Sequence, residues 1–281
     1  MNLLDALRER VWIADGAMGT RLFSKGISPE RCLEELNLSL PSLIAEIHRE
    51  YRAAGAEILE TNTFGANAVR LAAHALEDKV GAINIAAVRL ARAAAGADGF
   101  VAGAVGPLGA APVSGARNIF AAQIEALAEA GADYILLETF VDLDEIGEAI
   151  AAAKAACDLP VIAQVSPDEQ GDLAGGIGPE VFVPKLIERG ADAIGVNCGA
   201  GPGPMLEVIR RMAPHANVPL TAQPSAGLPI YRDSGMTFPC SPQEMAQFAL
   251  ELVHNGVRVV GGCCGTTPEH ISAIKTVISD E

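Results

Sequence analysis

The chain has 281 residues, half of them hydrophobic, and its 20 basic and 35 acidic side chains give a formal net charge of −15 at pH 7. This charge disfavours nucleic acid and anionic membrane surfaces as partners, because both attract basic faces. No apolar run approaches the ~20 residues of a membrane span, and the amphipathic segment 1–10 lacks the pattern of a secretory signal. We therefore expect a cytoplasmic protein with reduced cysteines.

Eight short apolar segments, separated by helical patterns, have the composition of buried β-strands. In chain order they are residues 11–15, 57–61, 100–105, 134–138, 161–165, 193–197, 220–223 and 257–261. A glycine stands shortly before four of them, where the preceding helix should end, since glycine takes the left-handed conformation cheaply. These glycines are Gly55, Gly131, Gly190 and Gly256. Apolar strands that alternate with helices are typical of a parallel sheet covered by those helices.

Eight strand–helix units in a chain of this length predict a (β/α)8 TIM barrel. An open, doubly wound parallel sheet is the alternative that the same pattern allows. No shift of composition, charged linker or low-complexity stretch divides the sequence, so we expect a single domain over residues 1–281. Because the active site of such a barrel forms at the carboxyl ends of its strands, the residues that follow each predicted strand are the candidates for function.

The predicted strand ends are rich in acidic, amide, glycine and cysteine residues. They comprise residues 15–20, 60–65, 106–109, 138–140, 164–166, 197–199, 223–225 and 261–265. None of the five lysines lies among them, which argues against a Schiff-base aldolase. The sequence contains neither a phosphate-binding G-x-x-x-x-G-K-[ST] loop nor a dinucleotide-binding G-x-G-x-x-G motif.

Three of the six cysteines follow two of these strands: Cys198 after the sixth, and Cys263 and Cys264 after the eighth. Neighbouring residues alternate faces within a strand, but glycine-rich sequence at the strand end allows both sulfurs to turn toward one metal. Three thiolates without a fourth protein ligand are typical of a catalytic zinc site with one open position. The alternatives for Cys263 and Cys264 are a small buried pair or a vicinal disulfide. For Cys32, Cys157 and Cys240 we predict ordinary packing or surface positions.

The same strand ends resemble the homocysteine S-methyltransferase family. The matching segments are DGAMGT at 15–20, ETNTFGAN at 60–67, LLETF at 136–140, NCG at 197–199 and GGCCGTTPEHI at 261–271, of which the last is the most specific. Matches in order run from about residue 12 to residue 275. The resemblance is strongest to the homocysteine-binding module of cobalamin-dependent methionine synthases. A similar module is fused to methylenetetrahydrofolate reductase in bifunctional bacterial proteins.

The resemblance implies a (β/α)8 barrel in which Cys198, Cys263 and Cys264 hold Zn²⁺ and so activate the thiol of homocysteine for methylation to methionine. It also implies that Asp15 and Glu138 bind the amino group of homocysteine. Backbone N–H groups near Ala17 and Met18 are then expected to bind its carboxylate. An ion pair with a basic side chain is the alternative for Glu138, and a turn-forming role is the alternative for Asp15. Glu60 is left without a predicted role.

The residues do not identify the methyl donor. Methylfolate, S-methylmethionine, S-adenosylmethionine and partner-bound methylcobalamin are the candidates. Betaine is disfavoured, because the betaine-using branch of the family carries an aromatic residue where this chain has Gly65. Two alternatives to a complete methyltransferase stay open. One is a non-autonomous module that binds zinc and homocysteine and needs a partner carrying cobalamin or folate. The other is a metal-independent barrel lyase with incidental cysteines.

Overall fold

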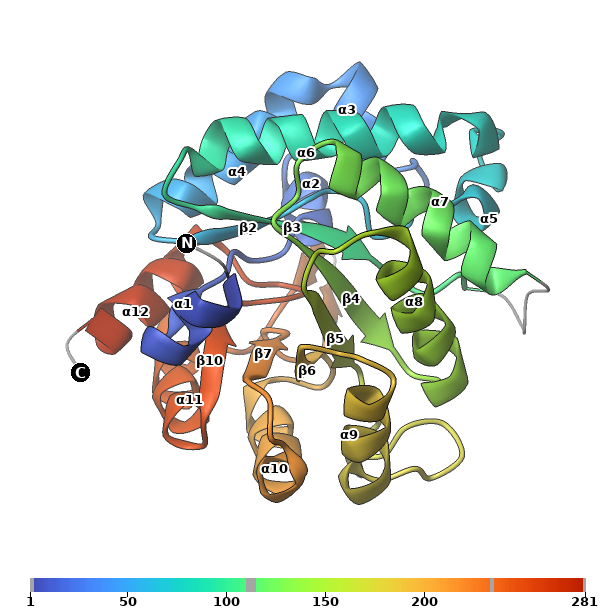
Figure 1. Ribbon diagram of the computed structural model, residues 1–281. Helices are drawn as coiled ribbons and strands as arrows, with labels where there is room; N and C mark the ends of the chain where they lie inside the picture. The colour runs from blue at the N-terminus through green and yellow to red at the C-terminus, as the bar shows by residue number, and fades with distance from the viewer. Residues whose placement is uncertain (1–2, 110–114, 233–234, 280–281) are drawn as a thin grey trace.

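The structure is a computed structural model that describes residues 3–109, 115–232 and 235–279. Within these residues, eight parallel strands follow one another around a central sheet (Figure 1). They are β1 (Trp12–Ile13), β2 (Ile58–Glu60), β3 (Phe100–Val105), β4 (Tyr134–Phe140), β5 (Val161–Val165), β6 (Ala193–Cys198), β7 (Leu220–Pro224) and β10 (Val257–Val260). A bridge between Ala14 and Ile58 connects β1 to β2 and brings the sheet round on itself. The predicted (β/α)8 barrel is confirmed, and the open sheet is excluded.

Helices surround the strands, as Figure 1 shows. The longer ones are α1 (Leu3–Glu9), α4 (Pro41–Ala53), α6 (Val80–Ala95), α7 (Ala116–Glu129), α8 (Leu143–Ala156), α9 (Pro179–Glu188), α10 (Pro202–Met212), α11 (Pro242–His254) and α12 (Pro268–Ser279). Short elements lie in the connections: α2 (Gly19–Ser24), α3 (Leu36–Ser39), α5 (Ala68–Ala72), η1 (Glu77–Lys79) and η2 (Ala213–His215). None of the described helices is long and apolar enough to cross a membrane.

In most of the strands, alternate residues belong to two different apolar layers. In β4, Ile135 and Leu137 belong to the large cluster that the strands share with the outer helices. Tyr134 and Leu136 belong to a second cluster that also includes Trp12 of β1 and residues of α1. This division follows the period of two of a β-strand. Because α1 packs into this second cluster at the amino ends of the strands, side chains fill that end of the barrel. The carboxyl ends of the strands are left to form a site.

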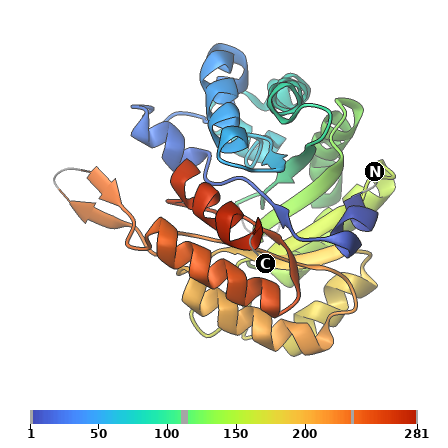
Figure 2. The same cartoon turned by 90° about the vertical axis from the view of Figure 1, so that its left-hand side faces the viewer.

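An antiparallel hairpin follows β7 and was not predicted from the sequence. It consists of β8 (Ile230–Arg232) and β9 (Gly235–Thr237). Figure 2 shows it extending away from the barrel. Tyr231 of this hairpin is 77% exposed, so the apolar residues there do not belong to a buried core. A sequence pattern of buried strands therefore does not predict the hairpin.

Candidate active site

A cavity of about 270 Å³ opens at the carboxyl ends of the strands. We call it the thiol cavity. It is lined by Asp15, Gly16, Ala17, Met18, Gly19, Thr20, Phe23, Leu33, Glu34, Glu60, Thr61, Asn62, Thr63, Phe64, Glu138, Thr139, Cys198, Gly262, Cys263 and Cys264. The sequence-predicted residues therefore line one cavity together, although they come from four strand ends. Ala17 and Met18 contribute from the connection between β1 and α2.

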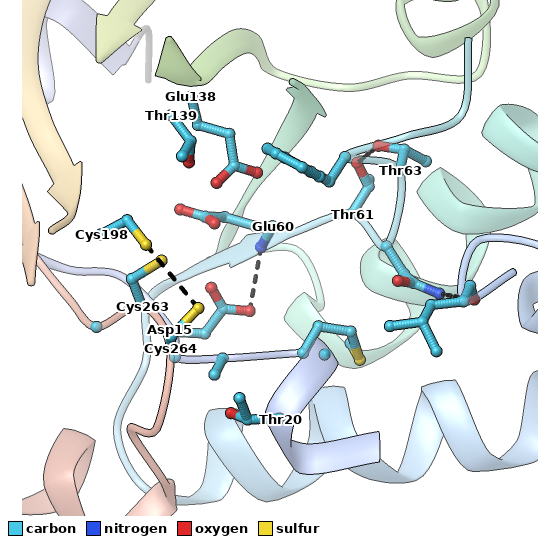
Figure 3. A pocket seen from close by; sticks show the side chains of 18 of the residues that line it. Asp15, Thr20, Glu60, Thr61, Thr63, Glu138, Thr139, Cys198, Cys263 and Cys264 are labelled. Carbon is cyan, nitrogen blue, oxygen red and sulfur yellow. Dashed lines mark hydrogen bonds between the residues drawn. The ribbon is translucent and has the colours of Figure 1, made fainter. Parts of the chain in front are cut away.

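The three cysteines meet on one side of the thiol cavity (Figure 3). Their Sγ atoms all lie within 4.8 Å of one another, and Cys198 Sγ stands 3.9 Å from Cys264 Sγ. Cys198 ends β6, whereas β10 stops at Val260 and leaves Cys263 and Cys264 in a turn. That turn is held by two hydrogen bonds of the Cys263 backbone. Its N–H donates to the carbonyl of Pro224 at 2.9 Å, and its carbonyl accepts from the hydroxyl of Thr266 at 2.7 Å. The two adjacent sulfurs thus face one point, and neither is in a disulfide.

The close approach of the three sulfurs has a strong effect on their ionisation. The pKa of Cys198 falls to about 2, because the thiols of Cys263 and Cys264 can donate to its thiolate. The pKa of Cys264 rises to about 12, chiefly because its thiol is hydrogen-bonded to Cys198. Ionisation of Cys198 therefore disfavours ionisation of its two neighbours, which act as hydrogen-bond donors to it. A divalent cation between the sulfurs is the group that allows all three to ionise.

Two non-glycine residues at this rim have left-handed backbone: Cys198, with φ of 65°, and Thr139, with φ of 63°. Such a conformation costs on the order of 1–3 kcal/mol and persists where the surroundings enforce it. Asn197 supplies that constraint for Thr139. Its side-chain oxygen accepts the N–H of Thr139 at 2.7 Å, and its amide donates to the Thr139 hydroxyl at 2.7 Å and to Glu138 Oε2 at 3.2 Å. Asn197 therefore positions Glu138, a role that sequence reasoning missed although the NCG motif contains the residue.

Three carboxyl groups face the sulfurs from the other side of the thiol cavity, and Figure 3 shows Glu60 between Glu138 and Asp15. Asp15 Oδ2 accepts the N–H of Glu60 at 3.1 Å, while Asp15 Oδ1 is buried with no partner. Gln223 donates to Glu60 Oε1 at 2.5 Å. No basic side chain of the described residues forms an ion pair with Glu138, so the ion-pair alternative for this residue finds no support in the structure. Glu60, which was left without a role, lines the same cavity.

Burial raises the pKa of each of these carboxyl groups, because desolvation penalises the charged form. The pKa of Glu60 rises to about 7. The pKa values of Asp15 and Glu138 also lie well above the usual range, through burial first and then through the charge of Glu60. Among the described residues these carboxyl groups have no basic partner, and a bound cationic group would favour their ionised forms.

The connection 16–18 between β1 and α2 is fixed by hydrogen bonds behind the cavity. Ala17 donates its N–H to the hydroxyl of Thr266 at 3.1 Å, and its carbonyl accepts the hydroxyl of Tyr51 at 2.8 Å. The Ala17 N–H, which the family resemblance implies as a donor to the substrate carboxylate, is therefore engaged with Thr266 in this structure. Met18 follows it along the cavity wall.

The remaining cysteines lie outside the thiol cavity. Cys32 is 7% exposed and packs in a small apolar cluster, and burial raises the pKa of its thiol to about 11. Cys157 follows the end of α8, and Cys240 precedes α11 with its carbonyl hydrogen-bonded to His270. This agrees with the ordinary packing that was predicted for them.

The family model described as homocysteine S-methyltransferase matches residues 12–278. The chain belongs to the homocysteine S-methyltransferase family. Two curated methionine synthases are similar along 99% of the chain: that of Mycobacterium tuberculosis (strain ATCC 25618 / H37Rv) at 33% identity and that of Mycobacterium leprae (strain TN) at 32%. The chain spans only a quarter of the length of either relative.

A solved structure is similar over nearly the whole chain. The homocysteine methyltransferase MmuM from Escherichia coli, in its metallated form, is 26% identical with a TM-score of 0.82. The similarity covers 98% of this chain and 98% of MmuM. Membership in the homocysteine S-methyltransferase family, which the sequence resemblance indicated, is thus confirmed.

Proposed function

We propose that this protein transfers a methyl group to the thiol of homocysteine in a zinc-dependent reaction that yields methionine. The observation that carries the proposal is the composition of the thiol cavity. Three sulfurs converge on one point, and three carboxyl groups face them across a space large enough for a small amino acid. A thiol amino acid has a sulfur for the first group and an ammonium for the second.

The cysteines fit zinc. Tetrahedral coordination with Zn–S bonds of about 2.3 Å separates two sulfurs by about 3.8 Å. The distance between Cys198 Sγ and Cys264 Sγ is 3.9 Å. The metal-ligand group found among the described residues has three members and no fourth, which leaves one position for the substrate sulfur. When bound, zinc removes the proton from a coordinated thiol and leaves a nucleophilic thiolate at neutral pH.

The carboxyl groups fit the ammonium group. Asp15 Oδ1 is a buried acceptor that lacks a donor, and an ammonium would supply one. Glu138 is held by Asn197, and Glu60 is held by Gln223, so both carboxyl groups are oriented before the substrate arrives. Such preorganisation aims the substrate sulfur and lowers the entropic cost of transfer. We include Glu60 in the proposed site for this reason.

The substrate carboxylate is assigned to the backbone around Ala17 and Met18, as the family resemblance implies. For Ala17 this assignment requires its N–H to move from Thr266 to the substrate. In the transfer itself, a bond forms between the substrate sulfur and the methyl carbon as the bond from that carbon to the donor heteroatom breaks. The heteroatom keeps the electron pair, and the proton of the substrate thiol is released to solvent.

The closest competing function is a module that binds zinc and homocysteine but needs a partner to deliver the methyl group. The one-quarter coverage of the methionine synthases supports it, since those proteins have three quarters of their length outside this similarity. The full-length coverage of MmuM supports a barrel that works alone.

The deciding experiment is methionine formation by the zinc-loaded protein. Homocysteine is held constant while the donor is varied among methylfolate, S-methylmethionine, S-adenosylmethionine, betaine and methylcobalamin. Methionine from a free donor is the expected result and establishes an autonomous methyltransferase. Zinc and homocysteine binding without methionine from any donor would favour the module. A protein that binds neither zinc nor homocysteine would overturn both.

A further inference from the structure

A second cavity, of about 560 Å³, adjoins the thiol cavity and has no role so far. We call it the outer cavity. It shares Leu33, Glu34 and Phe64 with the thiol cavity, so these three side chains form the partition between the two spaces. Its other walls come from the segment before α3, from α5 and from the connection after β3. A molecule that reaches from one cavity into the other passes this partition.

Arg70 of α5 is the distinctive side chain of the outer cavity. Its guanidinium lies over the ring of Phe64, with 5.2 Å from its central carbon to the ring centroid. A Cβ added to Gly65 would stand 2.8 Å from Arg70 Nε, and one added to Gly109 would stand 3.1 Å from Arg70 Nη1. The guanidinium is thus held between two glycine-containing connections. Among the described residues it has no hydrogen-bond or ion-pair partner.

Arg31 and Glu34, which also line the outer cavity, are already engaged. Arg31 donates to Glu35 and to Ser39, at 3.2 and 2.8 Å. Glu34 accepts the N–H of Gly65 at 2.8 Å, and within the described residues it forms no ion pair with Arg70. Arg70 therefore offers the donors of a complete guanidinium to a ligand. This is an unusual place for such a group, because the neighbouring thiol cavity is lined by acidic side chains and thiols and the whole chain is acidic.

Guanidinium groups bind carboxylates through two parallel N–H donors. We propose that the outer cavity binds the methyl donor and that Arg70 binds a carboxylate of that donor, with the methyl group directed past Phe64 and Leu33 toward the thiol cavity. The inference rests on the proposed function and extends it to the second substrate. Two kinds of donor share this chemistry: an amino-acid sulfonium such as S-methylmethionine, and a methylfolate through its glutamate tail.

The partition distinguishes these two sources. A sulfonium carries its positive charge at the methyl-bearing atom, which would pass beside the carboxylate of Glu34 and the ring of Phe64. The methyl-bearing nitrogen of a methylfolate is neutral and gains nothing from that carboxylate. Glu34→Gln should therefore weaken binding of the sulfonium donor and leave binding of the folate donor unchanged.

The test is calorimetric titration of the zinc-loaded protein, without homocysteine, by S-methylmethionine and by 5-methyltetrahydrofolate. The proteins compared are the wild type, Arg70→Gln and the matched control Arg49→Gln. Arg49 is an exposed arginine of α4 that lines neither cavity. We expect the donor that binds the wild type to bind Arg70→Gln about tenfold more weakly, the lower end for a hydrogen bond to a charged group, and to bind Arg49→Gln unchanged. Homocysteine affinity should be the same in all three.

A second arm replaces the donor carboxylate by its carboxamide. The wild type should bind the carboxamide about tenfold more weakly than the acid, and Arg70→Gln should not distinguish the two. The inference is overturned if neither donor binds, if Arg70→Gln binds the donor as tightly as the wild type, or if the carboxamide binds as well as the acid. Because binding is measured without turnover, this result is independent of the methionine assay. If Arg70→Gln forms methionine as well as the wild type does, only the donor site is refuted. If donor binding depends on Arg70 but no methionine forms, only autonomous transfer is refuted.

Discussion

The thiol cavity and the outer cavity lie side by side but are built in different ways. The thiol cavity takes its chemical groups from strand ends, which a closed barrel holds in fixed register. Its carboxyl-bearing residues Asp15, Glu60 and Glu138 are buried or half-buried, and of its three cysteines only Cys264 is exposed. The outer cavity takes its groups from connections and from the short helix α5, and Arg70 is exposed. The first cavity is acidic, and the second offers Arg70, which has no ion-pair partner in the part of the chain that the structure describes. We infer that the framework fixes the part of the site that activates the thiol, and that the connections determine which donor is accepted.

The strongest test of this division replaces each cysteine of the thiol cavity in turn. Cys198→Ser, Cys263→Ser and Cys264→Ser should each lose most of the bound zinc and all measurable methyl transfer, because a catalytic zinc site with three protein ligands has none to spare. Metal analysis after purification and the methionine assay are the measurements. Cys157→Ser, outside the cavity, is the control and should retain both. Full zinc content and activity in any of the three variants would refute the ligand assignment.

A smaller effect is expected from the acidic side of the same cavity. Glu138→Gln should retain zinc and bind homocysteine about 10- to 100-fold more weakly, since it removes a charged partner of the ammonium group but keeps the shape of the side chain. The measurements are zinc content and the Kd for homocysteine. Glu125→Gln, on an exposed face of α7, is the matched control. Unchanged homocysteine affinity would remove Glu138 from the site.

The two cavities also differ in how far the sequence could predict them. Apolar strands and the glycines before them indicated all eight barrel strands, and the parallel barrel then placed Cys198, Cys263, Cys264 and Glu138 on one rim without further information. Glu60 was missed because its position along β2 gave no sign that Gln223, more than 160 residues later, would hold it beside Asp15. Such cross-barrel contacts depend on side-chain reach, which strand periodicity does not encode.

The outer cavity could not be predicted for a related reason. Arg70 lies in a five-residue helix whose start is fixed by Asn67, which accepts the N–H of Arg70 at 3.0 Å. The sequence signal for so short a helix is weak, and the position of the guanidinium over Phe64 depends on the path of two connections. Connections have no strand register, so the positions of their side chains can be known only from the folded structure.

The protonation of the thiol cavity offers a third test, which the outer cavity should not share. In the folded, metal-free protein the pKa of Glu60 is about 7, against its usual 4.5, because burial penalises the carboxylate. As pH rises, the Glu60 carboxyl group therefore loses its proton at a lower pH in the unfolded chain than in the folded protein. The contribution of Glu60 to stability is thus present below pH 4.5 and is lost as pH rises through 7, a change of about 3 kcal/mol.

Urea unfolding of reduced, metal-free protein between pH 4.5 and 8 measures this contribution. As pH rises, the free energy of unfolding should fall less for Glu60→Gln than for the wild type. Arg70→Gln is the control from the outer cavity and should show the wild-type dependence, since its charge does not change over this range. Equal slopes for Glu60→Gln and the wild type would mean that Glu60 is not protonated in the folded protein.

The smallest effect expected is that of Gly65→Ala, which tests whether the position of Arg70 matters. The added Cβ would stand 2.6 Å from Glu34 Oε1 and 2.8 Å from Arg70 Nε, so these side chains must move while the barrel need not. We expect stability within about 1 kcal/mol of the wild type. The donor KM should rise by about two- to fivefold at constant homocysteine KM, a fraction of the effect of deleting a charged hydrogen bond.

Gly81→Ala is the matched glycine control, because a Cβ there meets nothing within 4 Å, and both KM values should stay unchanged. An aromatic residue at position 65 would need much more space than alanine and would displace Arg70 from its place over Phe64. A donor held by an aromatic side chain at this position and a donor held by Arg70 are thus mutually exclusive. An increase in the homocysteine KM of Gly65→Ala as large as that in its donor KM would show that the two cavities are not separate binding sites.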